Sequence, residues 1–129
     1  MTSVPDNCLY TKDHEWLRVE GDLAATGITA HAAEQLGEVT FVELPDRDEK
    51  ITQGGVLGTV ESVKAVSEIF APAGGIVKDV NDRLAHEPEL INSDPYGEGW
   101  ICRIALTDRA ETGKLLTPAA YKGLIEDHQ

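Results

Sequence analysis

The stretch from residue 54 to residue 77 reads GGVLGTVESVKAVSEIFAPAGGIV and decides the fold of this chain. It is rich in Val and Ile, with breaks at Pro72 and at the glycine pair 74–75. Apolar residues between positions 60 and 69 recur every three residues, a spacing that a short helix also satisfies. No Gly, Asn or Pro marks a hairpin tip between them. The high β-branched content favours strands, while the spacing alone leaves the helix open.

The rest of the chain predicts a mostly β domain with short helices at its edges. Short strands divided by turn signals favour a sandwich or a barrel. Thr29 can cap a helix that stops at Gly37, and Thr117 can cap a C-terminal helix that Pro118 opens. The expected elements are strands at 15–20, 23–28, 38–44 and 99–106, helices at 30–36 and about 117–126, and loops at 46–55 and 82–99.

Charge is the unusual quantity in the composition. Eleven Lys and Arg face 23 Asp and Glu, for a formal net charge of −12. Nucleic-acid binding needs a surplus of cations against phosphate, so this class of function is disfavoured. An anionic membrane surface is disfavoured for the same reason. The acidity suits a soluble shuttle that meets basic patches on larger partners.

The chain shows no sign of secretion, membrane insertion or metal binding. Cys8 and Cys102 form no CxxC pair, so a reducing compartment is expected. The start MTSVPDNCLY lacks the features of a signal or transit peptide. No window approaches the ~20 apolar residues of a membrane span, and the four histidines have no ligand spacing. We expect one domain over residues 1–129, in the cytoplasm of a bacterial-type cell.

One lysine in the opening stretch stands between two glycine-marked bends. Gly54 lies ten residues before Lys64 and Gly75 eleven residues after it. This arrangement resembles the signature of the biotinyl and lipoyl domains. The resemblance implies a flattened barrel or sandwich of two antiparallel sheets, with Lys64 at the tip of a tight hairpin. Biotin carriers typically present Met-Lys-Met there, whereas this chain has Val63-Lys64-Ala65. Lipoyl is the better match.

Segments on both sides of this stretch narrow the resemblance to the H proteins of the glycine cleavage system. The resemblance covers about residues 9–105. These segments are Tyr10-Thr11-Lys12, His14-Glu15-Trp16, Gly27-Ile28-Thr29, Leu36-Gly37-Glu38-Val39, Phe41-Val42-Glu43-Leu44-Pro45, Glu61-Ser62-Val63-Lys64-Ala65, Leu90-Ile91-Asn92, Asp94-Pro95-Tyr96-Gly97 and Gly99-Trp100. The family usually has a Gly soon after Leu-Pro, where this chain reads DRDE at 46–49. The geometry of that turn cannot be carried over from the family.

The resemblance implies a carrier and not an enzyme. Lipoate would be joined by an amide to Lys64, in a recognition context of Glu61, Ser62, Val63 and Ala65, by a lipoate ligase or a lipoyl/octanoyl transferase. The pyridoxal-phosphate decarboxylase (P protein) would pass the aminomethyl group of glycine to this arm. The tetrahydrofolate-dependent T protein would remove it, and the flavin dehydrogenase (L protein) would reoxidise the dithiol.

The resemblance also implies a cleft that shelters the loaded arm. Its candidate residues are Glu15, Glu68 and His31. A protonated amine has no lone pair with which to expel the neighbouring sulfur. A carboxylate beside the amine raises the amine pKa, and a cleft that excludes water slows hydrolysis. Each carboxylate could equally be a solvated acid in a chain that has 23 of them.

Three other functions fit part of the pattern. No residue excludes a relay that passes lipoate to other enzymes. A biotin carrier is disfavoured by the absence of Met-Lys-Met. An enzyme that uses Lys64 as a Schiff-base amine would need a desolvated lysine with a depressed pKa, and a polar, acidic hairpin tip offers the opposite.

Overall fold

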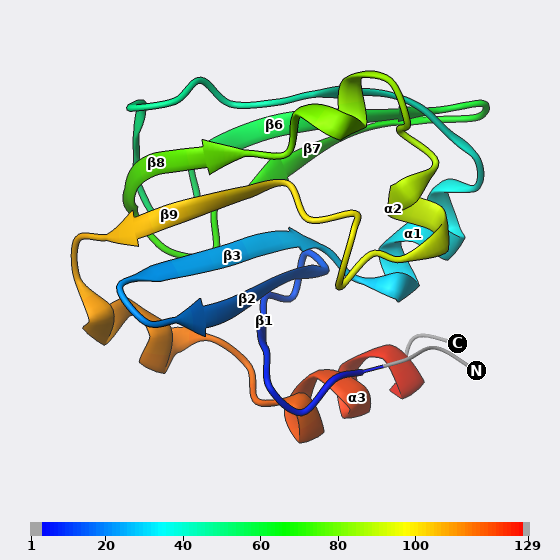
Figure 1. The fold of residues 1–129 in the computed structure, drawn as a ribbon. Coiled ribbons are helices and arrows are strands. Elements are labelled where there is room, and N and C mark those ends of the chain that lie inside the picture. The colour runs from blue at the N-terminus through cyan, green and yellow to red at the C-terminus, as the bar shows by residue number, and fades with distance from the viewer. Residues whose placement is uncertain (1–3, 128–129) are drawn as a thin grey trace.

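Two antiparallel sheets form the body of the chain in the computed structural model, which describes residues 4–127 (Figure 1). The larger sheet has six strands in the order β1 (Leu9–Tyr10), β2 (Glu15–Glu20), β3 (Leu23–Ile28), β9 (Cys102–Leu106), β8 (Gly75–Val80) and β5 (Lys50–Ile51). The smaller sheet has β4 (Val39–Glu43), β6 (Val56–Ser62) and β7 (Val66–Phe70). The helices are α1 (Ala30–Leu36), α2 (Leu90–Ser93) and α3 (Pro118–Asp127), with 3-10 turns at Asp82–Ala85 and Arg109–Lys114. The predicted sandwich is confirmed.

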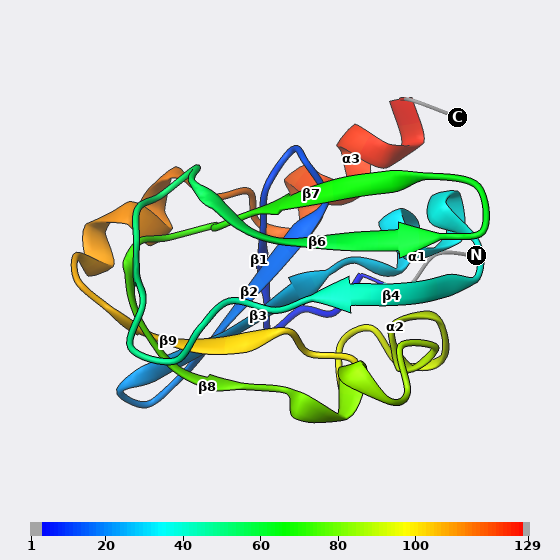
Figure 2. The ribbon, with the colours of Figure 1, turned by 90° about the horizontal axis from the view of Figure 1, so that it is seen from above.

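The stretch that left helix or strand open forms a β-hairpin. Strands β6 and β7 are antiparallel, with Glu61 opposite Val66 and Thr59 opposite Glu68. Val60 and Ile69 are buried between the sheets. Val63 and Val66, which completed the three-residue spacing, are exposed, so the apparent helical period did not correspond to one buried face. Seen from above, β4, β6 and β7 lie side by side and the β6–β7 tip reaches past α1 (Figure 2).

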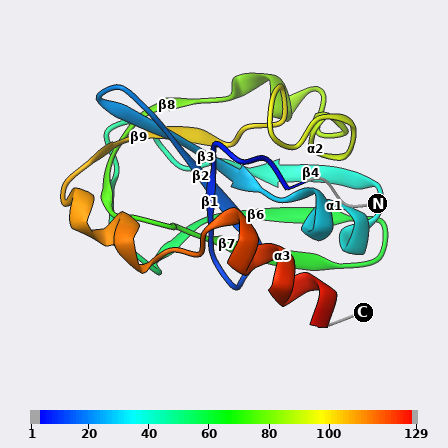
Figure 3. The same cartoon turned by 90° about the horizontal axis from the view of Figure 1, so that it is seen from below.

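The main core lies between the two sheets, and a second one lies beneath α3. Val60 and Ile69 of the smaller sheet belong to the same buried cluster as Val77 and Ile104 of the larger one. Strands that bury one face in this way obtain most of their stability from that burial. Helix α3 packs beside β1 (Figure 3), and the Tyr121 ring stacks on Tyr10 at 4.6 Å between centroids.

Three boundaries differ from the sequence prediction. The expected loop at 46–55 contains strand β5, which pairs with β8 at the edge of the larger sheet. The expected loop at 82–99 contains a 3-10 turn and α2. The strand expected from residue 99 begins at Cys102. Short edge strands and single helical turns depend on distant partners, so local composition did not indicate them.

The turn after Pro45 keeps a left-handed residue without using glycine. Asp48 has φ 68°, a conformation that aspartate tolerates better than most other non-glycine residues. Its backbone N–H donates to the Val77 carbonyl at 2.7 Å. The turn therefore stays hydrogen-bonded to β8 although it lacks the glycine that is usual in the family.

No helix within residues 4–127 is long and apolar enough to cross a membrane. Across the same described residues, no cluster of three His, Cys, Asp or Glu side chains could hold a metal ion.

Candidate functional site: an exposed lysine beside a small pocket

Lys64 lies at the tip of the β6–β7 hairpin, as the resemblance implied. Val63 and Lys64 form a two-residue loop between Ser62 and Ala65, whose backbones are joined by a Ser62 N–H to Ala65 C=O bond of 2.8 Å. Both loop side chains are exposed, Val63 to 67%. The lysine amine is thus accessible, and the two strands beneath it provide a rigid base.

The tip is held by contacts other than ordinary turn chemistry. Two-residue hairpin loops usually need a left-handed residue at the first central position. Among residues 4–127, His14 and Asp48 are the non-glycine residues with positive φ, so Val63 and Lys64 do not use that conformation. The Ser62 hydroxyl instead accepts from the Lys64 and Ala65 N–H groups at 3.3 and 3.1 Å. The Val63 N–H donates to the Glu38 carbonyl at 3.1 Å.

The stem of Lys64 lies against Gly37, the residue that ends α1. A Cβ on Gly37 would lie 3.4 Å from Cε of Lys64 and 4.0 Å from its Nζ. Gly37 has φ 77°, which favours glycine at a helix end. The lysine side chain therefore runs along the C-terminal end of α1, next to residues that line a pocket.

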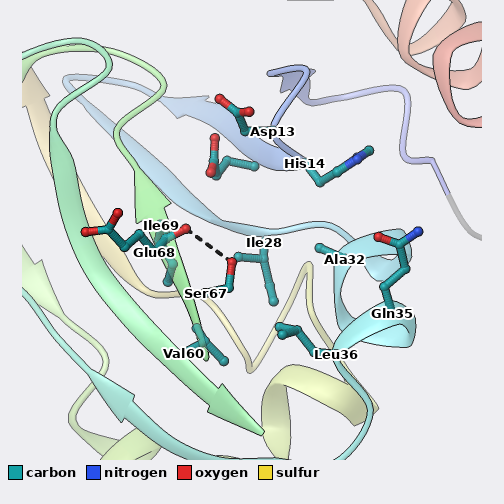
Figure 4. A pocket seen from close by; sticks show the side chains of 11 residues that line it. Asp13, His14, Ile28, Ala32, Gln35, Leu36, Val60, Ser67, Glu68 and Ile69 are labelled. Atoms are coloured by element: carbon teal, nitrogen blue, oxygen red, sulfur yellow. Dashed lines mark hydrogen bonds between the residues drawn. The ribbon is translucent and has the colours of Figure 1, made fainter. Parts of the chain in front are cut away.

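This pocket lies between the start of β2, helix α1 and the β6–β7 hairpin (Figure 4). Its volume is about 150 Å³, a size at which an apolar cavity can hold a small ring. The lining side chains are Asp13, His14, Glu15, Ile28, Ala32, Gln35, Leu36, Val60, Ser67, Glu68 and Ile69. Aliphatic groups line much of it, and acidic groups lie on the β2 and β7 sides.

Glu15 is buried in this pocket wall and forms no ion pair with a cation of residues 4–127. It is 2% exposed. Its carboxylate accepts from the Thr11 hydroxyl at 2.6 Å and from the Phe70 N–H at 3.1 Å. Burial raises the pKa of the Glu15 carboxyl, and the bonds from Thr11 and Phe70 lower it by less.

The raised pKa means that ionised Glu15 opposes folding. Its contribution to stability is fully present below the ordinary glutamate pKa of about 4.3, where the side chain is protonated in both states. It is lost as the pH rises through the higher folded-state pKa. Once ionised in the folded chain, the Glu15 carboxylate is a desolvated negative charge that an added cation would stabilise.

A tight turn between β1 and β2 directs Glu15 inward. The Thr11 hydroxyl accepts from the Glu15 N–H at 3.1 Å, and the Thr11 carbonyl accepts from the His14 N–H at 3.2 Å. His14 has φ 71°, and this left-handed residue lets the chain enter β2 with Glu15 facing the pocket. Nδ1 of His14 lies 2.8 Å from the Tyr121 hydroxyl, so α3 supports the turn.

The other two cleft candidates occupy different positions. Glu68 lines the pocket but is exposed, with its carboxylate directed away from the other lining side chains (Figure 4). His31 is not among the lining residues, and its ring lies 4.7 Å from that of His14. Sequence reasoning missed Gln35 and Ser67. The spacing of Ala32, Gln35 and Leu36 on α1 could have placed Gln35 on the lining face.

Comparison with known proteins identifies the family of this chain. The family model described as glycine cleavage H-protein matches residues 8–128. The chain belongs to this family. The family resemblance inferred from the sequence is confirmed.

Relatives and a solved structure match nearly the full chain. The chain is 53% identical to the probable glycine cleavage system H protein of Haloarcula marismortui, over 95% of this chain and 97% of that protein. It is 50% identical to the glycine cleavage system H protein of Herpetosiphon aurantiacus, over 98% and 97%. The crystal structure of such an H protein from Mycobacterium marinum has a TM-score of 0.89 at 38% identity, covering 95% and 99%.

Family membership confirms the general function expected from the sequence. The chain is a carrier of the glycine cleavage system and not one of its catalysts, and its group is lipoate. Membership in this system implies the P, T and L proteins as partners. The biotin-carrier and Schiff-base alternatives lose their support.

Proposed function

We propose that Lys64 is the residue that carries lipoate. The observation that supports this most strongly is its position at an exposed, rigid hairpin tip, with its stem beside Gly37, the residue that follows Leu36 of the pocket lining. When bound, lipoate supplies a dithiolane that can accept the aminomethyl group of glycine on one sulfur. The long flexible stem of Lys64 gives this group reach, and the paired strands below fix its starting point.

The pocket fits the end of such an arm in both size and charge. A volume of about 150 Å³ accommodates a small ring, and the lining side chains Ile28, Leu36, Val60 and Ile69 suit an apolar one. The carried amine would bring a positive charge to the buried Glu15 carboxylate, which has no ion pair with the described residues. Glu15 would then hold the amine protonated, while the pocket limits the access of water. Asp13 and Glu68 are the other acidic residues of the lining, and Glu68 would have to turn its exposed carboxylate inward to reach the amine.

We also propose how the chain acquires its lipoate. A lipoate ligase or a lipoyl/octanoyl transferase would read the exposed tip, Glu61 to Ala65, in the fixed conformation that Ser62 and Glu38 maintain. This would occur in the cytoplasm. Such an enzyme must select one of the six lysines of the chain. The sequence around a lysine in a flexible segment would distinguish it poorly from the other lysines.

The attachment is tested by mass. After incubation with lipoate ligase, ATP and lipoate, the intact chain should gain one lipoyl group. Peptide mapping should find it on the peptide that contains Lys64. A lipoyl group on another lysine would contradict the proposal.

Replacing Glu15 with Gln should shorten the lifetime of the loaded arm. Glutamine keeps the shape and removes the charge, so the carried amine loses a neighbour that raises its pKa by about one to three pH units. Because the unprotonated amine is the form that expels sulfur, release of ammonia near neutral pH should be about tenfold faster or more. The measurement is free ammonia over time at several pH values, after loading and removal of the decarboxylase.

A stability measurement separates this effect from misfolding. Glu15→Gln removes the carboxyl whose ionisation destabilises the folded chain, but its amide offers one acceptor oxygen to two donors, the Thr11 hydroxyl and the Phe70 N–H. Relative to the wild type, the variant should therefore gain urea resistance as the pH rises from 4 to 7, because only the wild type loses stability as Glu15 ionises. Glu68→Gln at the exposed rim is the matched control and should change both properties less. Equal ammonia release by wild type and Glu15→Gln at every pH would remove Glu15 from the proposal.

A further inference from the structure

The motif Leu90-Ile91-Asn92 has no part in the pocket or in the hairpin tip, yet its asparagine reaches the segment beside both. Asn92 lies on α2, and its side chain makes two hydrogen bonds to a segment 53 to 55 residues away. Oδ1 accepts from the Val39 N–H at 2.9 Å, and Nδ2 donates to the Gly37 carbonyl at 2.7 Å. One amide thus bonds both ends of residues 37–39.

The residue between these two bonds holds the tip. The Glu38 carbonyl accepts from the Val63 N–H at 3.1 Å, and Gly37 lies under the stem of Lys64. The loop of Val63 and Lys64 has no left-handed residue to set its own direction. Its orientation therefore depends on the Ser62 hydroxyl within the hairpin and on the Glu38 carbonyl outside it.

We propose that Asn92 is a positioning residue for Lys64. Through residues 37–39 it fixes the direction in which the hairpin tip presents the lysine. This rests on the proposed attachment of lipoate to Lys64. Asn92 touches neither the arm nor the cargo, and it acts by keeping the Glu38 carbonyl in place for the Val63 N–H. A tip that leaves this position presents the amine to the lipoylating enzyme for a smaller fraction of the time.

Amide hydrogen exchange and lipoylation kinetics test this role together. In Asn92→Ala, the Val39 and Val63 amides should exchange with solvent about tenfold faster. Local opening of residues 37–39 then costs less free energy, because it no longer has to break the two hydrogen bonds of the Asn92 side chain. The kcat/KM for lipoylation of the apo chain should fall about tenfold. Asn92→Asp keeps an acceptor for the Val39 N–H but sets an oxygen against the Gly37 carbonyl. The exchange rates and the kcat/KM of this variant should therefore lie between those of the wild type and of Asn92→Ala. Ser93→Ala, the neighbouring exposed position on α2, should match the wild type.

The outcomes distinguish a positioning role of Asn92 from a general effect on stability. They also distinguish failure of this proposal from failure of the proposed attachment to Lys64. Exchange at the Val77 and Ile104 amides reports the core, and it should be unchanged in both Asn92 variants. Core exchange accelerated as much as Val63 exchange would make Asn92 merely structural and overturn the proposal. Unchanged Val63 exchange, or full lipoylation despite a mobile tip, would also overturn it. If mapping placed lipoate elsewhere than Lys64, the attachment proposal would fail, while Val63 exchange would still report whether Asn92 holds the tip.

Discussion

A chain in which Lys64 is replaced by Arg should acquire no lipoyl group. Arginine keeps the positive charge and a similar length, and an exposed hairpin tip accommodates either side chain. The guanidinium is delocalised and stays protonated, so it offers no free amine for the amide bond. The loss should be complete, because the acceptor itself is absent. Intact mass after incubation with lipoate ligase, ATP and lipoate measures it.

Lys78→Arg is the matched control for this variant. Lys78 is also exposed, but it lies on β8 in the larger sheet, where no hairpin tip presents it. This variant should be lipoylated as fully as the wild type. A Lys64→Arg chain that still gained the lipoyl mass would show that the ligase accepts another lysine.

Replacing Gly75 with Ala should strongly destabilise the fold. Gly75 begins β8, between β5 and β9. A Cβ there would overlap the Ala105 carbonyl oxygen and lie 2.6 Å from Cγ2 of Ile104. The Ala105 carbonyl belongs to the backbone of β9 in the middle of the sheet, so it cannot move away without disturbing the pairing of β8 with β9. The expected loss is about 3 kcal/mol or more, measured by urea denaturation.

Replacing Gly123 with Ala should instead raise the stability of the fold. Gly123 lies inside α3, and nothing lies within 4 Å of a Cβ built there. Alanine in a helix interior is favoured over glycine by about 0.8–1.0 kcal/mol. Gly123→Ala should therefore unfold at higher urea concentration than the wild type.

A stable, fully folded Gly75→Ala would show that β8 and β9 can separate without loss of the sandwich.

The sequence predicted the elements whose signals are local. Thr29 and Gly37 mark the ends of α1 as expected, with the Thr29 hydroxyl accepting from the Ala32 N–H and the Gly37 N–H donating to the Ala33 carbonyl. The position of Lys64 at a tip followed from a family signature and not from periodicity, because the loop carries none of the usual turn residues. The Glu38 carbonyl that accepts from the Val63 N–H lies in the segment between α1 and β4, twenty-five residues before Val63 in the sequence, where no local pattern could reveal it.

The candidate site was predictable in its charged residue and not in its shape. Glu15 followed from the His14-Glu15-Trp16 segment. Its burial depends on the left-handed His14 and on the backbone of Phe70, which is 55 residues away. The pocket is bounded by β2, α1 and β7, which meet only after both sheets are formed. Contacts of this range are set by tertiary packing, which overrides local preference.

The interior place of β9 has a consequence for the newly made chain. β9 spans Cys102–Leu106 and is inserted between β3 and β8. While the ribosome still holds residues beyond about 100, β3 and β8 have no neighbour on their inner edges, and the larger sheet cannot close. The smaller sheet, by contrast, draws its strands from residues 39–70 alone. Pairing over such distances is slow, so the larger sheet should close later than the smaller one, once β9 has emerged.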